Sequence, residues 1–160
     1  MERLWSPWRM QYLTEERPQG CVFCLALAQE PGEENLVAWR GEWAAVMLNR
    51  YPYNAGHLLV VPYEHVASVE CLPAETLTEI WLLVNRSLGA LRRAMSPDGF
   101  NVGANLGRVA GAGIVDHVHL HIVPRWEGDT NFMPVLADVR VVPELLAETY
   151  RKVRAALEAE

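Results

Sequence analysis

The chain has 160 residues, of which 51% are hydrophobic and 21% are charged, and its formal net charge is −6 at pH 7. This length and this apolar content predict one globular domain with a core of its own. The negative charge argues against a general nucleic-acid binder, which normally has a basic surface, and no apolar stretch approaches the roughly 20 residues of a membrane span.

Residues 1–35 are predicted to form an N-terminal arm that carries a Cys-x-x-Cys motif. The first residues lack the features of a signal peptide, so we expect a cytoplasmic protein. The motif is Cys21-Val22-Phe23-Cys24, with a short helix beginning near Cys24 and a turn at residues 31–35. In a reducing compartment such a pair is more often a metal or redox element than a disulfide. A metal-free thiol pair is the third reading.

Residues 36–125 are predicted to form the catalytic core. Periodicity and turn signals predict the following elements in chain order: strands at 36–39, 43–49 and 58–62, a helix from about 73 to 91, a strand at 100–104 and a glycine-rich loop at 107–113. Gly41-Glu42 reads as a hairpin turn between the first two strands. Pro73 and Glu75 mark the first turn of the helix.

Residues 116–125 contain three histidines that alternate with apolar residues. Successive side chains of a strand point to opposite faces, so the apolar residues can enter a core while His117, His119 and His121 line the other, exposed face. Imidazole changes charge near neutral pH, and such a row can supply a nucleophile, a proton carrier or a metal ligand. A surface strand that happens to carry histidines is the alternative.

Residues 126–160 are predicted to form a loop and a last helix that starts at Pro143. Helix, three strands, long helix and two further strands predict an α+β domain with a mostly antiparallel sheet.

The histidine run also resembles a known family. His-φ-His-φ-His-φ-φ-Pro-Arg, where φ is apolar, resembles the signature of the histidine triad (HIT) superfamily of nucleotide hydrolases and transferases. Residues 49–62 resemble the earlier Asn…Gly-His segment of that superfamily, and residues 5–13 and 126–132 resemble the bacterial branch related to diadenosine tetraphosphate phosphorylases. The resemblance implies a HIT-like fold with a five-stranded, mostly antiparallel sheet, and a homodimer in which two sheets join into one.

The resemblance further implies a nucleotidyl transferase or hydrolase that cleaves dinucleoside polyphosphates through a nucleotidyl-histidine intermediate. His119 matches the nucleophile, and His121 matches the residue that binds the phosphoryl or bridging oxygen. If phosphate is the acceptor, diadenosine tetraphosphate gives ATP and ADP; if water is the acceptor, the enzyme is a hydrolase. The alternatives are a nucleoside phosphoramidate hydrolase and a non-catalytic nucleotide-binding protein.

Several further positions match substrate-binding residues of the superfamily. Asn49 matches a residue that contacts the ribose hydroxyls, and Asn105 matches one that helps to hold the phosphates. His57 matches a residue beneath the active site, although a hydrogen-bonded core histidine is an equal reading. Gly111 and Gly113 allow backbone amides to approach an anion. Many relatives have Ser, Thr or Gln where this chain has Gly113, which leaves the choice between water and phosphate open.

A metal site is also implied by the resemblance. Structural zinc takes four Cys or His ligands in a tetrahedron. Zinc-binding members of the superfamily use positions that match His65 and His117, and Cys21 and Cys24 would complete the set. We expect structural zinc and no organic cofactor.

Overall fold

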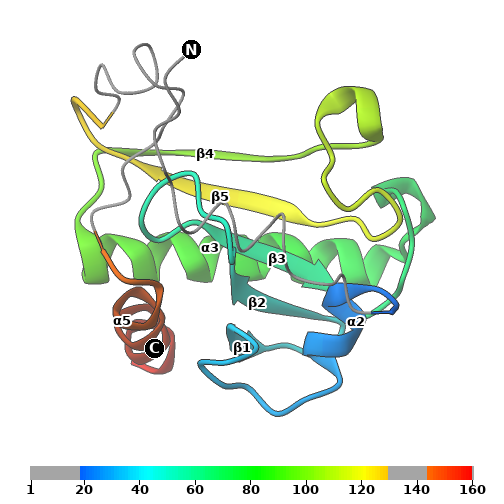
Figure 1. Cartoon of the computed structure of the whole chain (residues 1–160), viewed down its shortest axis with the longest axis horizontal. Helices are drawn as coiled ribbons and strands as arrows, with labels where there is room; N and C mark the ends of the chain where they lie inside the picture. Colours follow the sequence, from blue (N-terminus) through cyan, green and yellow to red (C-terminus); the bar gives the residue numbers. More distant parts are fainter. Residues whose placement is uncertain (1–18, 130–143, 160) are drawn as a thin grey trace, which may run out of the picture.

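A computed structural model describes residues 19–129 and 144–159 of the chain. The resemblance at residues 5–13, the end of that at 126–132 and the predicted helix start at Pro143 lie outside these residues. In the described part, five strands form one sheet in the order β1-β2-β3-β5-β4, and every neighbouring pair is antiparallel. Helices flank the sheet (Figure 1). The predicted α+β class with an antiparallel five-stranded sheet is confirmed.

The elements follow the sequence predictions closely. Their bounds are α2 (Val22–Leu27), β1 (Val37–Arg40), β2 (Ala44–Leu48), β3 (Leu58–Pro62), α3 (Ala74–Met95), β4 (Gly99–Ala104), β5 (Leu120–Arg125) and α5 (Leu146–Glu158), with 3-10 turns at Val69–Cys71 and Arg108–Ala110. None of the described helices combines the length and the apolarity needed to cross a membrane. The division into arm, core and C-terminal segment remains a prediction.

The strand that contains the histidines is shorter than predicted. β5 begins at Leu120, so His117 and His119 precede it. The hydrogen-bond ladder ends there because Pro62, at the end of the neighbouring β3, has no N–H to donate. The N–H of Val118 instead donates to the carbonyl of Val66, at 2.7 Å.

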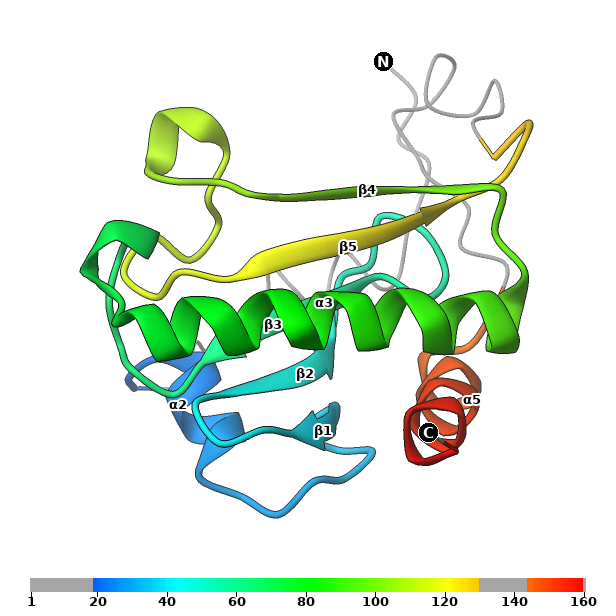
Figure 2. The same ribbon diagram turned by 180° about the vertical axis from the view of Figure 1, so that it is seen from behind.

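The sheet separates two hydrophobic clusters. Helix α3 crosses one face (Figure 2), and the larger cluster lies between α3, α5 and the inward residues of the strands. Val118, Leu120 and Ile122 belong to this cluster, as the alternation predicted. The second cluster lies on the opposite face, beneath α2 (Figure 1), and consists of Phe23, Leu27, Val37, Ala45, Met47, Leu59 and Val61. His121 pairs with Leu59, so its side chain belongs to this second face.

Glu79 of α3 anchors the predicted hairpin turn between β1 and β2. Its carboxylate accepts the N–H groups of Glu42, Trp43 and Ala44 at 2.7, 2.5 and 2.8 Å. A Cβ at Gly41 would lie 2.6 Å from Glu79 Oε1, so the close approach of this carboxylate requires glycine. The same contact holds the hairpin against α3.

Replacing Glu79 by alanine is expected to lower the free energy of unfolding by about 2 kcal/mol, because hydrogen bonds to charged groups contribute about 1.5–3 kcal/mol. Urea denaturation measures the change. Glu75→Ala is the matched control, since Glu75 is exposed and lies one turn earlier on the same helix. The free energy of unfolding of Glu75→Ala should fall by less than about 1 kcal/mol, the usual effect of a charge at a helix N-terminus. Equal losses in the two variants would contradict the anchoring role.

Candidate functional site

The three triad histidines divide between two sites. The rings of His119 and His121 lie 4.9 Å apart at an interplanar angle of 62°. The ring of His117 faces the thiols of Cys21 and Cys24, with its Nδ1 at 3.3 and 3.6 Å from the two sulfurs. His117 precedes β5, whereas His121 lies within it, and the two rings have different partners.

The predicted exposure of the histidine row is wrong. His117 is fully buried and His119 is only 7% exposed. Phe23 of α2 covers both rings, with centroid distances of 5.4 Å to His117 and 4.8 Å to His119. This cover has no local sequence signature, because α2 lies far from the histidines along the chain.

The hydrogen bond of His119 fixes its tautomer. Its Nδ1 lies 2.9 Å from the main-chain oxygen of His117. A carbonyl oxygen only accepts, so Nδ1 carries the proton and donates it. The lone pair of neutral His119 is therefore on Nε2, and that atom is the nucleophile the ring can offer.

A second chain of hydrogen bonds fixes the tautomer of His121. The N–H of Tyr53 donates to Nδ1 of His57 at 3.0 Å, so neutral His57 carries its proton on Nε2. This Nε2 lies 3.0 Å from Nδ1 of His121 and donates to it. Neutral His121 then carries its own proton on Nε2, which is buried and has no hydrogen-bond partner among the described residues. His121 thus presents an N–H donor beside the lone pair of His119.

Burial keeps these imidazoles uncharged. It lowers the pKa of His57 to about 3, and the neighbouring charges of His121 and His119 add to the effect. Burial, followed by the charge of His119, lowers the pKa of His121 to about 4. The pKa of His119 is also lowered by burial, although its bond to the His117 carbonyl opposes the shift. At neutral pH the tautomers above are therefore the dominant forms.

The loop between β2 and β3 supports this arrangement. The N–H of Asn49 donates to the carbonyl of His57 at 2.9 Å and closes the loop. The Oδ1 of Asn49 accepts the N–H of Tyr51 at 2.9 Å, and its Nδ2 lies 3.4 Å from Nδ1 of His57. The ring of Tyr53 stacks on His121 at 5.9 Å and 15°. Sequence reasoning missed Tyr53, because nothing in its spacing indicates an imidazole neighbour.

The turn after β5 is tied to the same loop. Asp129 accepts two hydrogen bonds from the guanidinium of Arg125, at 2.6 and 2.7 Å, and one from Nδ2 of Asn54, at 2.8 Å. Nδ2 of Asn54 also donates to the carbonyl of Pro124 at 3.0 Å. Asp129 therefore connects the histidine strand to the loop that carries Tyr53.

The predicted phosphate-loop residues gather between β4 and β5. Gly107 and Gly111 have positive φ angles of 86° and 90° and bracket the 3-10 turn Arg108–Ala110. A Cβ on Gly111 would meet Nδ2 of Asn105 at 3.8 Å, so these two predicted residues are neighbours. Gly113 is exposed, and Ile114 next to it packs on the cluster beneath α2.

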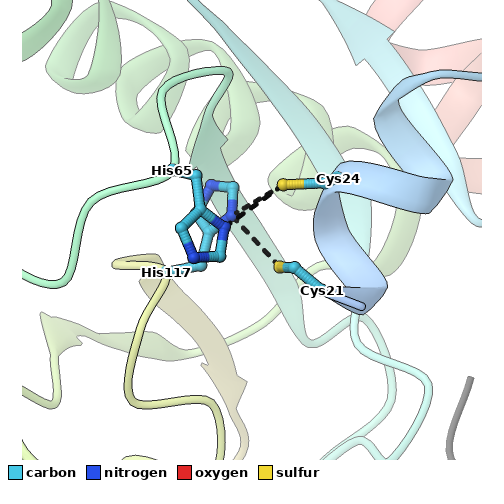
Figure 3. Close-up of side chains that lie close together, drawn as sticks. All are labelled: Cys21, Cys24, His65 and His117. Atoms are coloured by element: carbon cyan, nitrogen blue, oxygen red, sulfur yellow. Dashed lines mark hydrogen bonds between the residues drawn. The ribbon is translucent and has the colours of Figure 1, made fainter. Parts of the chain in front are cut away.

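The four predicted metal ligands come together (Figure 3). Cys21, Cys24, His65 and His117 each offer one ligand atom, and these atoms all lie within 4.8 Å of one another. Figure 3 shows the thiols of Cys21, just before α2, and of Cys24 in α2 pointing toward the two imidazoles. The rings of His65 and His117 meet edge to face, at an interplanar angle of 73°. Nδ1 of His65 lies 3.3 Å from the sulfur of Cys24.

This group fits a tetrahedral metal ion. Zinc bonds of about 2.0–2.3 Å place neighbouring ligand atoms roughly 3.3–3.8 Å apart, which the Sγ–Nδ1 distances of 3.3, 3.3 and 3.6 Å match. Nε2 of His117 donates to the carbonyl of Pro62 at 2.9 Å, so its Nδ1 lone pair faces the sulfurs. A backbone acceptor on the far nitrogen is the usual support of a metal-bound histidine. The group can hold a metal.

The chain is similar to known proteins over most of its length. The sequence profile of the HIT domain matches residues 34–128. An AP-4-A phosphorylase of Mycobacterium tuberculosis is 39% identical over 159 residues, which cover 94% of this chain and 82% of the relative. This chain belongs to the HIT domain family. An adenosine 5'-monophosphoramidase of Saccharomyces cerevisiae is 33% identical over 105 residues, which cover 66% of this chain and 62% of that protein.

A solved HIT structure supports the same assignment. A zinc-bound histidine triad family protein from Mycobacterium smegmatis has a TM-score of 0.69 and 32% identity, covering 88% of this chain and 94% of that one. The family and the HIT-like fold predicted from the histidine motif are therefore confirmed.

The low pKa of His57 predicts how the free energy of unfolding depends on pH. The unfolded chain takes up a proton near pH 6.5, whereas folded His57 does so only near pH 3. Stability is thus fully present above pH 6.5 and is lost as the pH falls toward 3, by at most ~1.4 kcal/mol per pH unit for one histidine. Urea unfolding between pH 6 and 4 should show a smaller slope against pH for His57→Gln than for the parent chain. Parallel slopes would mean that His57 is protonated in the folded state.

Proposed function

We propose that this chain is a nucleotidyl transferase or hydrolase that cleaves dinucleoside polyphosphates, with diadenosine tetraphosphate as the favoured substrate. The observation that carries the proposal is the pair of tautomers on two rings whose centroids lie 4.9 Å apart. His119 has an Nε2 lone pair, and His121 has an Nε2–H with no hydrogen-bond partner in the part of the chain that the structure describes. Attack at phosphorus requires a nucleophile and a hydrogen-bond donor to the phosphoryl oxygen together. The name of the M. tuberculosis relative supports the substrate.

The reaction follows from these roles. His119 Nε2 forms a bond to the α-phosphorus, and the bond from that phosphorus to the bridging oxygen breaks, so ATP leaves and the histidine carries an adenylate. The Nε2–H of His121 donates to the phosphoryl or bridging oxygen as negative charge develops on it. In the second step phosphate attacks the adenylate to give ADP, or water attacks to give AMP.

The remaining predicted residues are proposed to bind the substrate. Asn49 would contact the ribose, and His57 would hold His121 in its donor tautomer through Nε2. Asn105, with its neighbour Gly111, would face the phosphates, and the exposed amide of Gly113 would supplement them.

Zinc is proposed as the metal of the Cys21, Cys24, His65 and His117 group. Two thiolates and two imidazoles in a closed set of four are the donors of a structural zinc site. Zinc there supplies cross-linking rather than chemistry, because it would tie α2 to the segments that follow β3 and precede β5. The three cysteines are unbonded, which agrees with a reducing compartment and with the proposed cytoplasmic location.

One assay tests the proposal and separates it from its alternatives. The chain is incubated with diadenosine tetraphosphate, with and without phosphate, and the products are separated. ATP plus ADP formed only with phosphate means a phosphorylase, whereas AMP plus ATP formed in water means a hydrolase. Two ADP would mean cleavage at the central phosphate bridge and would reject attack of His119 at the α-phosphorus. No consumption would reject the proposal in favour of a nucleotide-binding protein.

Phosphoramidate hydrolysis is the second candidate. It is favoured by the likeness to the yeast adenosine 5'-monophosphoramidase and uses the same histidine intermediate. Adenosine 5'-monophosphoramidate in the same assay decides between them. If kcat/KM for the phosphoramidate is at least tenfold above that for the polyphosphate, phosphoramidate hydrolysis becomes the preferred function.

A homodimer with a continuous sheet is proposed as the assembly. β4 is an edge strand, and Asn101, Val102 and Gly103 at its centre are exposed. An exposed edge offers unpaired backbone groups to a second copy. Sedimentation equilibrium should give twice the chain mass of 18.0 kDa.

A further inference from the structure

Phe23 lies between the two thiols in sequence and between two histidines in space. Its ring is 4% exposed and contacts His117 at an interplanar angle of 82° and His119 at 60°. His117 belongs to the proposed metal group, whereas His119 is the proposed nucleophile. The ring therefore touches one residue of each site.

Helix α2 sets the direction of the ring and of the thiols together. The helix is six residues long and begins directly after Cys21. Phe23 and Leu27 are four residues apart and form its buried face, while Cys21 and Cys24 point to the metal group. So short a helix has little stability of its own. Its position therefore depends on its buried side chains and on whatever holds the two thiols.

The backbone of His117 provides a second link between the sites. Its carbonyl accepts the Nδ1–H of His119 at 2.9 Å, and its ring Nε2 donates to the carbonyl of Pro62 at 2.9 Å. A displacement of the His117 ring would move the carbonyl that fixes the tautomer of His119. Both links start at the metal group and end at the same imidazole.

We propose that Phe23 is a positioning residue that couples occupancy of the Cys21, Cys24, His65 and His117 group to the orientation of His119. The inference rests on the proposed role of His119 as nucleophile. An occupied group holds α2 in place, and the Phe23 ring keeps the His119 imidazole with its Nδ1–H on the His117 carbonyl. An empty group frees α2, and the imidazole can then turn or change tautomer.

The test uses zinc-loaded full-length chain and the variants Phe23→Ala and Phe23→Leu. Leu27→Ala is the matched control, because Leu27 lies on the same face of α2 and in the same cluster. Zinc content and thermal unfolding establish that each variant is folded and loaded. Side-chain ¹⁵N NMR then reports the tautomer of His119, and steady-state kinetics separates kcat from KM.

The parent chain and Leu27→Ala should show His119 protonated at Nδ1. Phe23→Ala should show mixed tautomers at full zinc content, with kcat reduced about 10- to 100-fold and KM changed less than about threefold, as expected for a misplaced reacting group. Phe23→Leu should fall between them. Chelation of zinc should change the His119 NMR signals of the parent chain in the same way as the Phe23→Ala substitution does. In the Phe23→Ala variant, chelation should cause little further change in these signals. Where chelation unfolds the parent, exchange of zinc for the larger cadmium ion is the perturbation.

Two results would overturn the coupling: a parent-like His119 tautomer in zinc-loaded Phe23→Ala, or equal effects of metal exchange with and without the Phe23 ring. If Phe23→Ala does not fold, the same two results in Phe23→Leu overturn it. The NMR measurement needs no turnover. A parent chain that fails to cleave any nucleotide while its His119 signals follow the metal would reject the proposed function and leave the coupling intact.

Discussion

Replacing His119 by alanine is expected to reduce turnover of diadenosine tetraphosphate at least ~10⁴-fold while nucleotide binding persists. His119 is the residue whose Nε2 lone pair is left free by the bond from Nδ1–H to the His117 carbonyl. Its removal takes away the bond-forming atom, and loss of a covalent nucleophile is among the largest single effects seen in enzymes. Product formation measures turnover, and calorimetric titration with the nucleotide measures binding.

His121→Ala gives the contrasting result. It removes only a hydrogen-bond donor, so the expected loss of kcat is about 10²–10³-fold, the usual effect of removing one donor to a developing oxyanion. Substrate labelled at the α-phosphorus, which is bonded to the adenosine 5′-oxygen, should leave label on the parent chain and on His121→Ala after an alkaline quench, and none on His119→Ala. Turnover of His119→Ala within tenfold of the parent would reject His119 as nucleophile.

Sequence alternation predicted which side chains of the histidine strand enter the core. Apolar residues at every second position placed Val118, Leu120 and Ile122 in the core and left the histidines to the other face. The Cys-x-x-Cys spacing, read with the family resemblance, predicted four residues that the structure brings within 4.8 Å. These predictions succeeded because they depend on local periodicity and on a motif.

Properties that depend on long-range packing escaped the sequence. The burial of His119 comes from Phe23, and the donor tautomer of His121 comes from the amide of Tyr53 through His57. The contacts of Phe23 with His119 and of His57 with His121 have no local signature, because each joins segments far apart in the chain. The bond from the Tyr53 amide to His57 is local, but no periodicity in the loop indicates it. The late start of β5 was predictable in part. The sequence shows Pro62, which lacks an N–H, but it does not show that Pro62 lies opposite the residues just before β5.

Removing zinc is expected to lower the melting temperature by roughly 8–16 °C. An ion bound only by the folded chain stabilises it by about 4 kcal/mol when present at 1,000 times its dissociation constant. For a chain of this size each kcal/mol shifts the melting temperature by about 2–4 °C. Scanning calorimetry with zinc and with a chelator measures the shift.

Cys24→Ser should lose most of this dependence on zinc, because the hydroxyl replaces one of two thiolate ligands. Burial raises the pKa of the Cys24 thiol, and a hydrogen bond and charge from Cys21 add to the shift, so without a metal ion this thiol stays protonated at neutral pH. Zinc binding must therefore release that proton, and the stabilisation should grow as the pH rises toward the thiol pKa. Cys71→Ser is the control, since Cys71 is exposed and outside the metal group. Identical melting temperatures with and without zinc, from neutral pH up to the pKa of the Cys24 thiol, would exclude a structural metal. The cluster would then be a thiol pair beside two imidazoles, and α2 would depend on Phe23 and Leu27 alone for its position.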